Sequence, residues 1–405
     1  MRKVWSAVAA TAVALALGAT AYAQSGKQTV KIGVLNDMSS LYRDLGGPGS
    51  VVAAKMAIAD YAKIDPNLKV ELVSADHQNK PDIASSIATK WYDSEGVDAI
   101  FDLTTSSVAL AVSQVSLNKD KAAIVSGAAS SDLTGKKCNA NTVHYVYDTW
   151  MLANGTGKAM VKTGGDTWFF ITADYAFGHA LERDTGNVVK ANGGKVLGAV
   201  RVPLNTSDFS SFLLQAQASK AKVIGLANAG GDTINSIKQA AEFGIVKGGQ
   251  SLAGLLVFST DVISLGLPTA QGLVLTSAWY WDANDANRAW TKRFQKEMPG
   301  KIPSMVQAGV YSSIIDYLKA VSALKQSKSG KAVIEKMKSM SADDVLFGKG
   351  KIRADGRKIH DVYLFEVKKP SESKYPGDIY KLRATIPAAE AFRPLKDDGC
   401  SLVKG

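Results

Sequence analysis

Small hydroxyl side chains follow two of the strands that this sequence predicts. Thr104, Thr105 and Ser106 come after the apolar run VDAIFDL, and Ser130 comes after the run AAIVSGA. Each group stands where a helix or turn begins, and the free backbone N–H groups there bind carboxylates or phosphates together with neighbouring hydroxyls. The alternative is that these hydroxyls are ordinary N-caps. Two such loops at one edge of a sheet predict a site that grips one anion.

Aromatic side chains stand near the ends of other predicted strands and could supply an apolar wall. These positions are Tyr42, Trp150, Tyr175, Phe177 and Tyr280. Most aromatic residues belong to a core, but several on strand-end loops indicate an apolar pocket with polar ends. Asp261 also follows a predicted strand. Its carboxylate could accept a cationic or hydroxyl group, with helix capping as the alternative.

The glycine-rich segment LGGPGS does not fit a nucleotide site. A dinucleotide fingerprint needs its glycines directly after a strand, whereas ten residues separate Leu35, the end of the first predicted strand, from Gly46. The segment GTGK at 155–158 fails the phosphate-loop pattern, because Ala159 follows it and Leu152 stands where glycine is required. We therefore expect the glycines to start the first helix.

Motifs of hydrolases and metal enzymes are absent from the sequence. It contains neither G-x-S-x-G nor H-E-x-x-H, and its four histidines do not follow strands beside a serine or a carboxylate. Scattered histidines and two distant cysteines make a poor metal site. We expect no catalytic residues, no metal and no cofactor.

The elements that position these residues form two groups with the same rhythm. Short β-branched runs alternate with stretches of helical periodicity, which predicts parallel, doubly wound sheets. The predicted strands are 30–35, 70–76, 97–103 and 122–128, then 167–173, 195–204, 222–228 and 252–258. Ligands of such sheets bind outside the carboxyl ends of the strands, so two facing sheets create a cleft.

The C-terminal part of the sequence departs from this rhythm. Three helical stretches follow residues 272–281, and a turn at Asp355 and Gly356 between two extended segments predicts a hairpin. A polar loop and a tail without strong periodicity end the chain.

The first residues have the pattern of a secretion signal. Arg2 and Lys3 precede an apolar stretch, and an A-x-A site ends at Ala23. The apolar run is interrupted and short for a membrane span, so we expect cleavage after residues 1–23, with an uncleaved anchor as the alternative. The net charge of +11 comes from scattered Lys and Arg without a basic stripe, which argues against nucleic-acid binding. The 405-residue length predicts two domains.

Cys138 and Cys400 are the two cysteines of the chain. In an oxidising exported compartment, such an isolated pair forms a disulfide more readily than it stays as two free thiols. The bond would tie the C-terminal tail to the first third of the chain.

Several segments together resemble the type I periplasmic solute-binding proteins of ABC importers, in particular the leucine/isoleucine/valine-binding group. They are KIGVLNDMSSLYRDLG, DLTTSSVALAV, AAIVSGAASSDLT, TADYAFG, ANAGGDTINSIKQAAEFG and FSTDV before GLVLTSAWYW. The resemblance implies an α/β fold of two doubly wound, Rossmann-like lobes, joined by three crossovers and closing over a ligand by a hinge. The expected boundaries are 27–148 with 279–357 for lobe I, 149–278 with 358–383 for lobe II, and 384–405 for a tail.

The resemblance also assigns roles to residues. The strongest matches to positions that hold the ligand's carboxylate and α-amino group are Thr105, Ala128 and Ser130. Asp261 matches the acid that receives an ammonium, and Tyr175 or Phe177 covers the ligand. We also expect the ligand to be contacted at the edge of the cleft on lobe I, by Asp37, Ser39 and Tyr42.

The function implied by the resemblance is capture of a small carboxylate-bearing ligand in the cleft, without catalysis. The protein would be a periplasmic monomer that presents the ligand to an ABC permease in the inner membrane. Three features depart from the amino-acid binders and are similar to relatives that take aromatic carboxylates. They are the loop that begins at Asn36, the pair Tyr280 and Trp281, and the tail cysteine Cys400. Branched-chain amino acids and aromatic acids both remain open. A sensing module for a membrane receptor is the alternative function.

Overall fold

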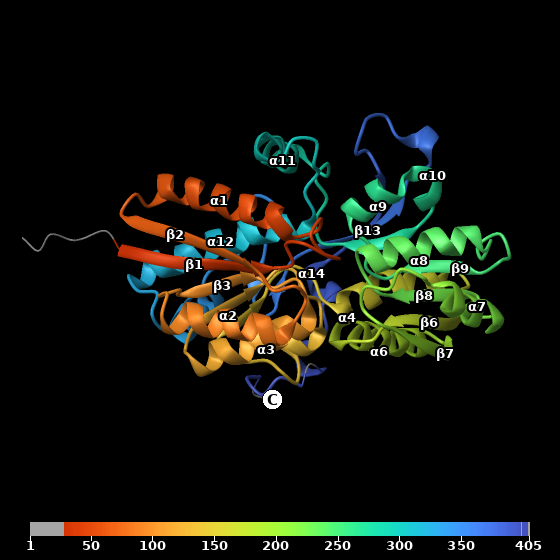
Figure 1. Ribbon diagram of the computed structural model, residues 1–405, viewed down its shortest axis with the longest axis horizontal. Helices are drawn as coiled ribbons and strands as arrows, with labels where there is room; N and C mark the ends of the chain where they lie inside the picture. The colour runs from red at the N-terminus through yellow and green to blue at the C-terminus, as the bar shows by residue number, and fades with distance from the viewer. Residues whose placement is uncertain (1–27, 398, 404–405) are drawn as a thin grey trace, which may run out of the picture.

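Each of the two predicted groups of strands forms its own parallel sheet, and the sheets lie in separate lobes (Figure 1). The computed structural model describes residues 28–397 and 399–403, so the predicted secretion signal lies outside the described residues. Lobe I is defined here by the five-stranded sheet and lobe II by the four-stranded sheet. Within the described part of the chain, no helix is both long and apolar enough to cross a membrane.

The sheet of lobe I has the strand order β2-β1-β3-β4-β5, all parallel. Its strands are β1 (Gln28–Asn36), β2 (Leu68–Asp76), β3 (Ala99–Asp102), β4 (Ala122–Val125) and β5 (Thr142–His144). Its helices are α1 (Gly47–Ile64), α2 (Pro81–Asp93), α3 (Ser106–Asn118), α11 (Asp285–Glu297), α12 (Met305–Leu324) and α13 (Gly330–Ser339). Phe101 packs in the core on the side of α1 and α12, and its neighbour Ile100 packs on the side of α2 and α3. Both faces of the sheet are therefore buried, as parallel sheets require.

The sheet of lobe II has the strand order β7-β6-β8-β9, also parallel. Its strands are β6 (Thr167–Ala173), β7 (Lys195–Val202), β8 (Val223–Ala227) and β9 (Ser251–Gly254). The helices of this part are α4 (Thr149–Leu152), α5 (Lys158–Lys162), α6 (Ala176–Ala191), α7 (Ser210–Ala218), α8 (Gly231–Glu242), α9 (Ser259–Leu265) and α10 (Leu267–Ala270). A π-helical segment, η2 (Ala153–Gly157), joins α4 to α5.

Three further strands form a small antiparallel sheet in the order β10-β13-β14. They are β10 (Val274–Ser277), β13 (Val362–Val367) and β14 (Tyr380–Ile386). The predicted hairpin is confirmed by β11 (Lys351–Ile352) and β12 (Lys358–Ile359), which pair antiparallel across Gly356 at φ 86°. The remaining elements are η1 (Ser131–Thr134), η3 (Pro370–Glu372), α14 (Ala388–Ala391) and η4 (Leu395–Asp397).

The predicted strands need three corrections. The strand expected at 252–258 ends at Gly254, and the chain then turns into the loop that precedes α9. The short strand β5 was not among the predicted ones, because its three residues are too few to show a period. The tail without periodicity contains β14, an edge strand whose solvent-facing residues hide the alternation.

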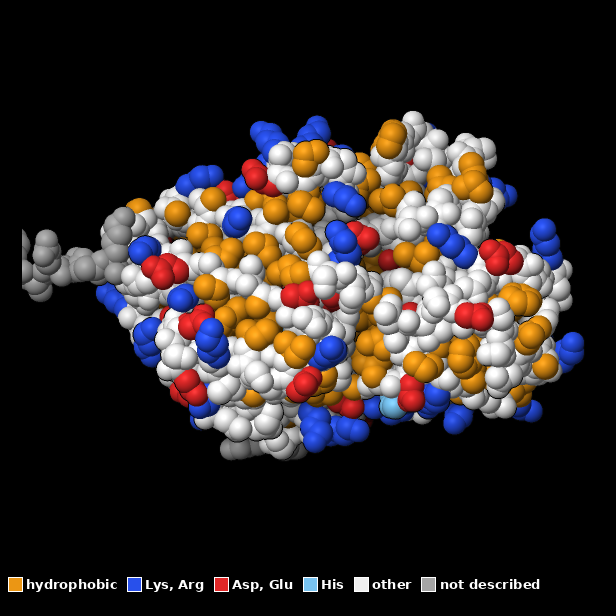
Figure 2. Space-filling view, viewed as in Figure 1, with side chains coloured by type: hydrophobic (Ala, Val, Ile, Leu, Met, Phe, Trp, Pro, Cys, Tyr) orange, Lys and Arg blue, Asp and Glu red, His pale blue; other side chains and the backbone are white. Residues whose placement is uncertain are grey.

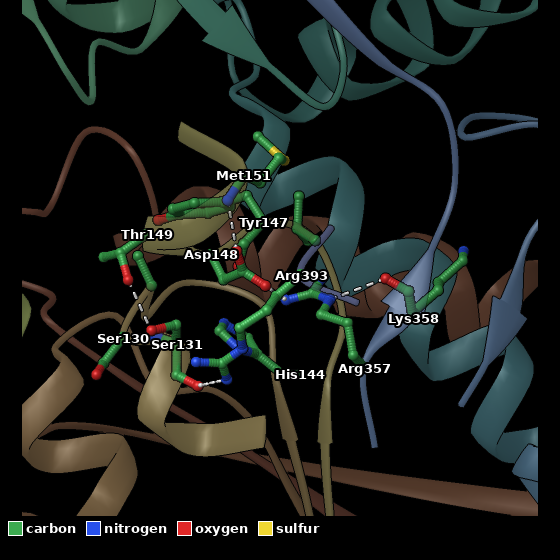
Figure 3. A network of polar contacts seen from close by, with 12 residues as sticks. Ser130, Ser131, His144, Tyr147, Asp148, Thr149, Met151, Arg357, Lys358 and Arg393 are labelled. Carbon is green, nitrogen blue, oxygen red and sulfur yellow. Dashed lines mark hydrogen bonds and ion pairs between the residues drawn. The ribbon is translucent and has the colours of Figure 1, made fainter. Parts of the chain in front are cut away.

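A buried charged cluster lies where the chain leaves lobe I after β5 and again after β12 (Figure 3). Arg357 is 1% exposed, and its Nη1 donates to the carbonyl of Tyr147 at 2.9 Å and lies 3.6 Å from a carboxylate oxygen of Asp148. Burial lowers the pKa of Arg357 to about 10, although the Asp148 carboxylate partly offsets this effect. The ring of Phe392 from the tail covers the guanidinium at 4.8 Å.

The predicted disulfide between Cys138 and Cys400 is present, with 5.6 Å between the two Cα atoms. It fastens the C-terminal tail to lobe I beside η1. The tail also touches the neighbourhood of the crossovers, because Asn154 donates to the carbonyl of Glu390 at 2.7 Å.

Candidate ligand-binding site

A small cavity lies between the carboxyl ends of the two parallel sheets. Side chains fill most of it, and the space left for a water-sized sphere is about 10 Å³, roughly enough for one water molecule. Its lining comes from the loops after β1, β3, β4 and β5 of lobe I and from those after β6, β8 and β9 of lobe II. The lining residues are Tyr42, Leu45, Thr104, Ser106, Gly127, Ala129, Tyr147, Tyr175, Phe177, Ala229, Leu256 and Phe258. Hydrophobic side chains also gather on the surface where the lobes meet (Figure 2).

Ser106, the first residue of α3, directs a hydroxyl donor at this cavity. Its Oγ accepts the backbone N–H groups of Ala129 at 3.3 Å and Ser130 at 3.1 Å. A hydroxyl has two lone pairs and one proton, so both lone pairs are used. The remaining O–H of Ser106 can therefore only donate. The positive end of the 13-residue helix α3 adds to its attraction for an anion.

The hydroxyl of Thr104 is also left with only its proton to offer, through different hydrogen-bond partners. Its Oγ1 accepts the backbone N–H of Asp37 at 3.1 Å and lies 3.1 Å from Nε2 of His77. Nδ1 of His77 accepts the N–H of Asn79 at 3.0 Å. Burial lowers the pKa of His77 to about 4, so the ring is neutral near pH 7 and its single proton sits on Nε2. Thr104 thus accepts two bonds, and its O–H is also left to donate.

Two tyrosines from opposite lobes close the cavity. The hydroxyl of Tyr42, after β1, lies 2.5 Å from the hydroxyl of Tyr175, after β6. Burial raises the pKa of both phenols, so both are neutral at physiological pH. Phe177 packs beside Tyr175, with 5.8 Å between ring centroids.

The lobes also touch outside the cavity. Asp184 of α6 accepts hydrogen bonds from the hydroxyls of Ser131 and Thr149, each at 2.6 Å. Arg183, its neighbour, lies 3.1 Å from a carboxylate oxygen of Asp132. Since the contacts of Ser131 and Asp132 with α6 cross from lobe I to lobe II, the structure has the lobes closed on each other.

Five predicted site residues line the cavity, and the others take supporting or outer positions. Asp37 is buried and accepts the N–H of Tyr42 at 2.8 Å and the side-chain amide of Asn79 at 2.7 Å. Thr105 donates its hydroxyl to the same Asn79. Asp37 and Thr105 thus tie the first loop to the start of α3 rather than face the cavity.

Ala128 and Ser130 flank a lining residue without lining the cavity themselves. The carbonyl of Ala128 lies 2.8 Å from Nε2 of His144, and Oγ of Ser130 accepts the N–H of Asp132 at 3.4 Å, as an N-cap does. The side chain between them, Ala129, reaches the cavity.

Ser39 and Asp261 line a second hollow nearer to the mouth of the cleft. Asp261 caps α9 by accepting the N–H of Phe258 at 2.9 Å. Burial raises the pKa of its carboxyl to about 7.

Two predicted aromatic residues lie elsewhere. Tyr280 packs against Phe365 and Tyr380 in the core of lobe II, and its hydroxyl donates to the carbonyl of Gly377 at 2.7 Å. Trp150 belongs to the short helix α4 and is not among the lining residues.

The sequence reasoning missed Tyr147 and, apart from Phe177, the lining residues that have no polar side chain. The ring of Tyr147 packs edge-on against Phe258, with 6.0 Å between centroids, and its hydroxyl donates to the carbonyl of Gly127 at 2.5 Å. Tyr147 lies next to residue 148, the expected end of the first segment of lobe I, and Phe258 directly precedes α9. Proximity to a crossover and to a strand end were the signals that could have found them.

The residues described here hold no group of three or more His, Cys, Asp or Glu that could bind a metal ion. None of the described side chains that line the cavity is charged. The arrangement can therefore bind an acceptor at the Thr104 and Ser106 hydroxyls and an apolar body against the rings.

Comparisons with known proteins agree with this geometry. Residues 29–374 match the model of a family described as periplasmic binding protein. The solved structure of a periplasmic binding protein from Burkholderia mallei is 55% identical, with a TM-score of 0.90 over 94% of this chain and 100% of that chain. A branched chain amino acid ABC transporter periplasmic ligand-binding protein from Burkholderia xenovorans LB400 is 40% identical, with a TM-score of 0.81 over 92% and 99%.

A more distant structure shares the fold. It is an ABC transporter solute binding protein from Rhodopseudomonas palustris HaA2 in complex with p-hydroxybenzoic acid. It is 23% identical, with a TM-score of 0.81 over 89% of this chain and 98% of that chain.

Proposed function

Because the chain belongs to the periplasmic binding protein family, we propose that it captures a small aromatic carboxylate between its lobes and delivers it to an ABC permease. Members of this family are solute-binding proteins of ABC transporters rather than enzymes. The proposal therefore concerns the ligand, the partner and the periplasmic location of this chain.

The observation that carries the proposal is the pair of hydroxyl donors at one end of the cavity. Thr104 and Ser106 each accept two N–H groups, so each can only donate to a ligand. Two donors beside a helix N-terminus suit a carboxylate, which accepts but never donates when ionised. A neutral ligand hydroxyl or amide would not carry the negative charge that the helix N-terminus attracts.

The rest of the cavity supports a flat apolar body. The rings of Tyr42, Tyr147, Tyr175, Phe177 and Phe258 supply most of the wall. Aromatic walls of this kind pack against an aromatic ligand through offset or edge contacts. The tyrosine hydroxyls could meet a polar group at the far end of the ring.

The charge of the cavity favours an acid without an ammonium group. Burying an ammonium requires an opposite charge or several acceptors, and none of the described lining side chains is acidic. Asp261, the residue expected to receive an ammonium, lies in the outer hollow and is engaged with the N–H of Phe258. A branched-chain amino acid is the second candidate, favoured by the 40% identity to the branched chain amino acid ABC transporter periplasmic ligand-binding protein.

A thermal-shift screen with p-hydroxybenzoate, benzoate, L-leucine and L-valine tests the proposal. A ligand that binds the folded state raises the melting temperature by mass action. We expect shifts with the two aromatic acids and smaller or no shifts with the amino acids. Larger shifts with the amino acids would contradict the aromatic preference. An absence of any shift would contradict carboxylate binding.

The role of Ser106 is tested by calorimetry with Ser106→Ala. Loss of a hydrogen bond to a charged group is worth about 1.5–3 kcal/mol, so we expect roughly 10- to 150-fold weaker binding of p-hydroxybenzoate. Ser113→Ala is the matched control, because Ser113 is a buried serine of the same helix whose hydroxyl donates to the carbonyl of Leu110. Equal affinity of Ser106→Ala and the wild type would remove Ser106 from the site.

A further inference from the structure

A buried carboxyl without a cationic partner lies directly behind the anion end of the cavity. Asp102, the last residue of β3, is fully buried, and its Oδ2 accepts the side-chain amide of Asn36 at 2.6 Å. Its other oxygen, Oδ1, has no hydrogen-bond partner among the described residues. A methyl group placed on the lining residue Gly127 would stand 2.8 Å from that Oδ1. Only a glycine backbone thus separates the oxygen from the cavity.

The backbone holds this carboxyl in place at the expense of strain. Asp102 and Leu103 have φ angles of 82° and 57°, a left-handed conformation that residues with a side chain rarely adopt. The carbonyl of Asp102 accepts the N–H groups of both Ser126 and Gly127, each at 3.0 Å. Consecutive strained residues of this kind persist where the surrounding structure fixes them, and they cluster at functional sites.

The groups described here that face the Asp102 carboxyl are neutral. Asn36 approaches from β1, Ser50 from α1, and the neutral phenol of Tyr147 from the segment after β5. His77 stands behind Thr104 and is also neutral. No ion pair of Asp102 with Lys, Arg or His occurs in the described structure. Burial accordingly raises the pKa of Asp102 to about 6, with the neighbouring side chains of Ser50 and Asn36 offsetting part of the effect.

We propose that Asp102 is a proton-binding site coupled to the ligand site, so that the protein takes up a proton when it binds a carboxylate. This inference rests on the proposed function, because it needs an anionic ligand at Thr104 and Ser106. A ligand carboxylate there brings a second negative charge close to Asp102 across Gly127. Like charges in a buried site favour protonation of one of them. The ligand carboxylate is held by donors, so Asp102 takes the proton.

The sign of the pH dependence follows from this linkage. In the free protein Asp102 ionises as the pH rises through about 6, and in the complex its pKa lies higher. Affinity is therefore greatest below the pKa of the free protein and falls as pH rises toward the pKa of the complex. One coupled proton changes the dissociation constant by at most about tenfold per pH unit.

Calorimetry with p-hydroxybenzoate between about pH 6 and pH 8 tests the proposal. For the wild type we expect the dissociation constant to rise roughly fivefold or more over this range. We also expect the measured heat to depend on the ionisation enthalpy of the buffer, which reports proton uptake. Asp102→Asn keeps the size and the acceptor for Asn36 but cannot ionise, so its dissociation constant should change by less than about twofold.

A control variant and the possible outcomes keep the two proposals distinct. Asp316→Asn removes another buried carboxyl of lobe I with a raised pKa, outside the cavity lining, and should keep the wild-type pH slope. Binding without a pH slope, or a slope that Asp102→Asn retains, overturns the coupling and leaves the proposed function intact. If neither p-hydroxybenzoate, benzoate nor L-leucine binds at any pH, the proposed function fails and the coupling fails with it.

Discussion

A hydroxyl whose lone pairs are both occupied can act only as a donor, and this rule selects the residues that we propose bind an anion. Thr104 and Thr105 are adjacent in the sequence but have opposite roles. Thr104 accepts two N–H groups and lines the cavity, whereas Thr105 donates its proton to Asn79. The two residues before them, Asp102 and Leu103, both have left-handed φ angles.

Asp261 illustrates a buried carboxyl that caps a helix and should make stability depend on pH. Its folded-state pKa of about 7 lies above the unfolded value of about 3.9. The folded state therefore binds the extra proton between these values, and stability is lost as pH rises through about 7. Asp261→Asn keeps an acceptor for the N–H of Phe258 and cannot ionise. We expect it to raise the melting temperature at about pH 8 by a few degrees more than at about pH 5.

An exposed carboxyl provides the matched control for that measurement. The pKa of Asp208 is lowered by hydrogen bonds from Ser210, so its ionised form is favoured in the folded state. Asp208 is therefore ionised in both the folded and the unfolded state above about pH 5, and Asp208→Asn should change the melting temperature by the same amount at about pH 5 and at about pH 8. If both variants show the same pH trend, Asp261 does not titrate as the burial argument requires.

At the scale of elements, closure depends on two loops that meet across the cleft. Tyr42 lies in the loop between β1 and α1, and Tyr175 immediately precedes α6. Their hydroxyl contact exists only when the lobes are closed, so it stabilises the closed state without touching the open one. A ligand enclosed behind the two rings leaves only after this contact breaks.

Tyr175→Phe should therefore accelerate ligand release. The ring that lines the cavity is kept, and one hydrogen bond worth about 0.5–1.5 kcal/mol is lost, so we expect a roughly 2- to 10-fold faster dissociation rate of p-hydroxybenzoate in stopped-flow experiments. Tyr42→Phe should have the same effect, and the double variant should be no worse than either single one. Tyr61→Phe is the control, because its hydroxyl bonds Ser322 within lobe I. Additive effects of the two cleft variants would argue against a direct contact.

Parallel sheets and their loops were predictable because their strands are buried on both faces and read as continuous apolar runs. That signal fails for β14, where Leu382 is 57% exposed and Lys381 and Arg383 pair with Glu366. The signal also fails within loops, because two residues of the same type can follow apolar runs while only one of their side chains points into the cavity. Tyr280 and Tyr175 both follow apolar runs, yet only Tyr175 faces the cavity.

At the scale of the whole molecule, the C-terminal tail holds together the region where the chain crosses between lobes. Phe392 covers the buried guanidinium of Arg357, and Arg393 donates to the carbonyl of Ser131 at 3.2 Å. The disulfide between Cys138 and Cys400 fixes the end of this tail to lobe I. Hinge motion must therefore occur while the tail stays attached at its end.

The disulfide should stabilise the folded protein strongly and affect binding little. It spans 262 residues, and cross-linking distant residues restricts the unfolded chain, typically by about 2–5 kcal/mol. We expect the variant with Cys138→Ser and Cys400→Ser to melt several degrees below the wild type in calorimetry. A reductant should lower the melting temperature of the wild type to that of the variant and leave the variant unchanged. Because the cysteines lie outside the cavity lining, affinity for p-hydroxybenzoate should stay within about twofold; a larger loss would show that the anchored tail controls closure.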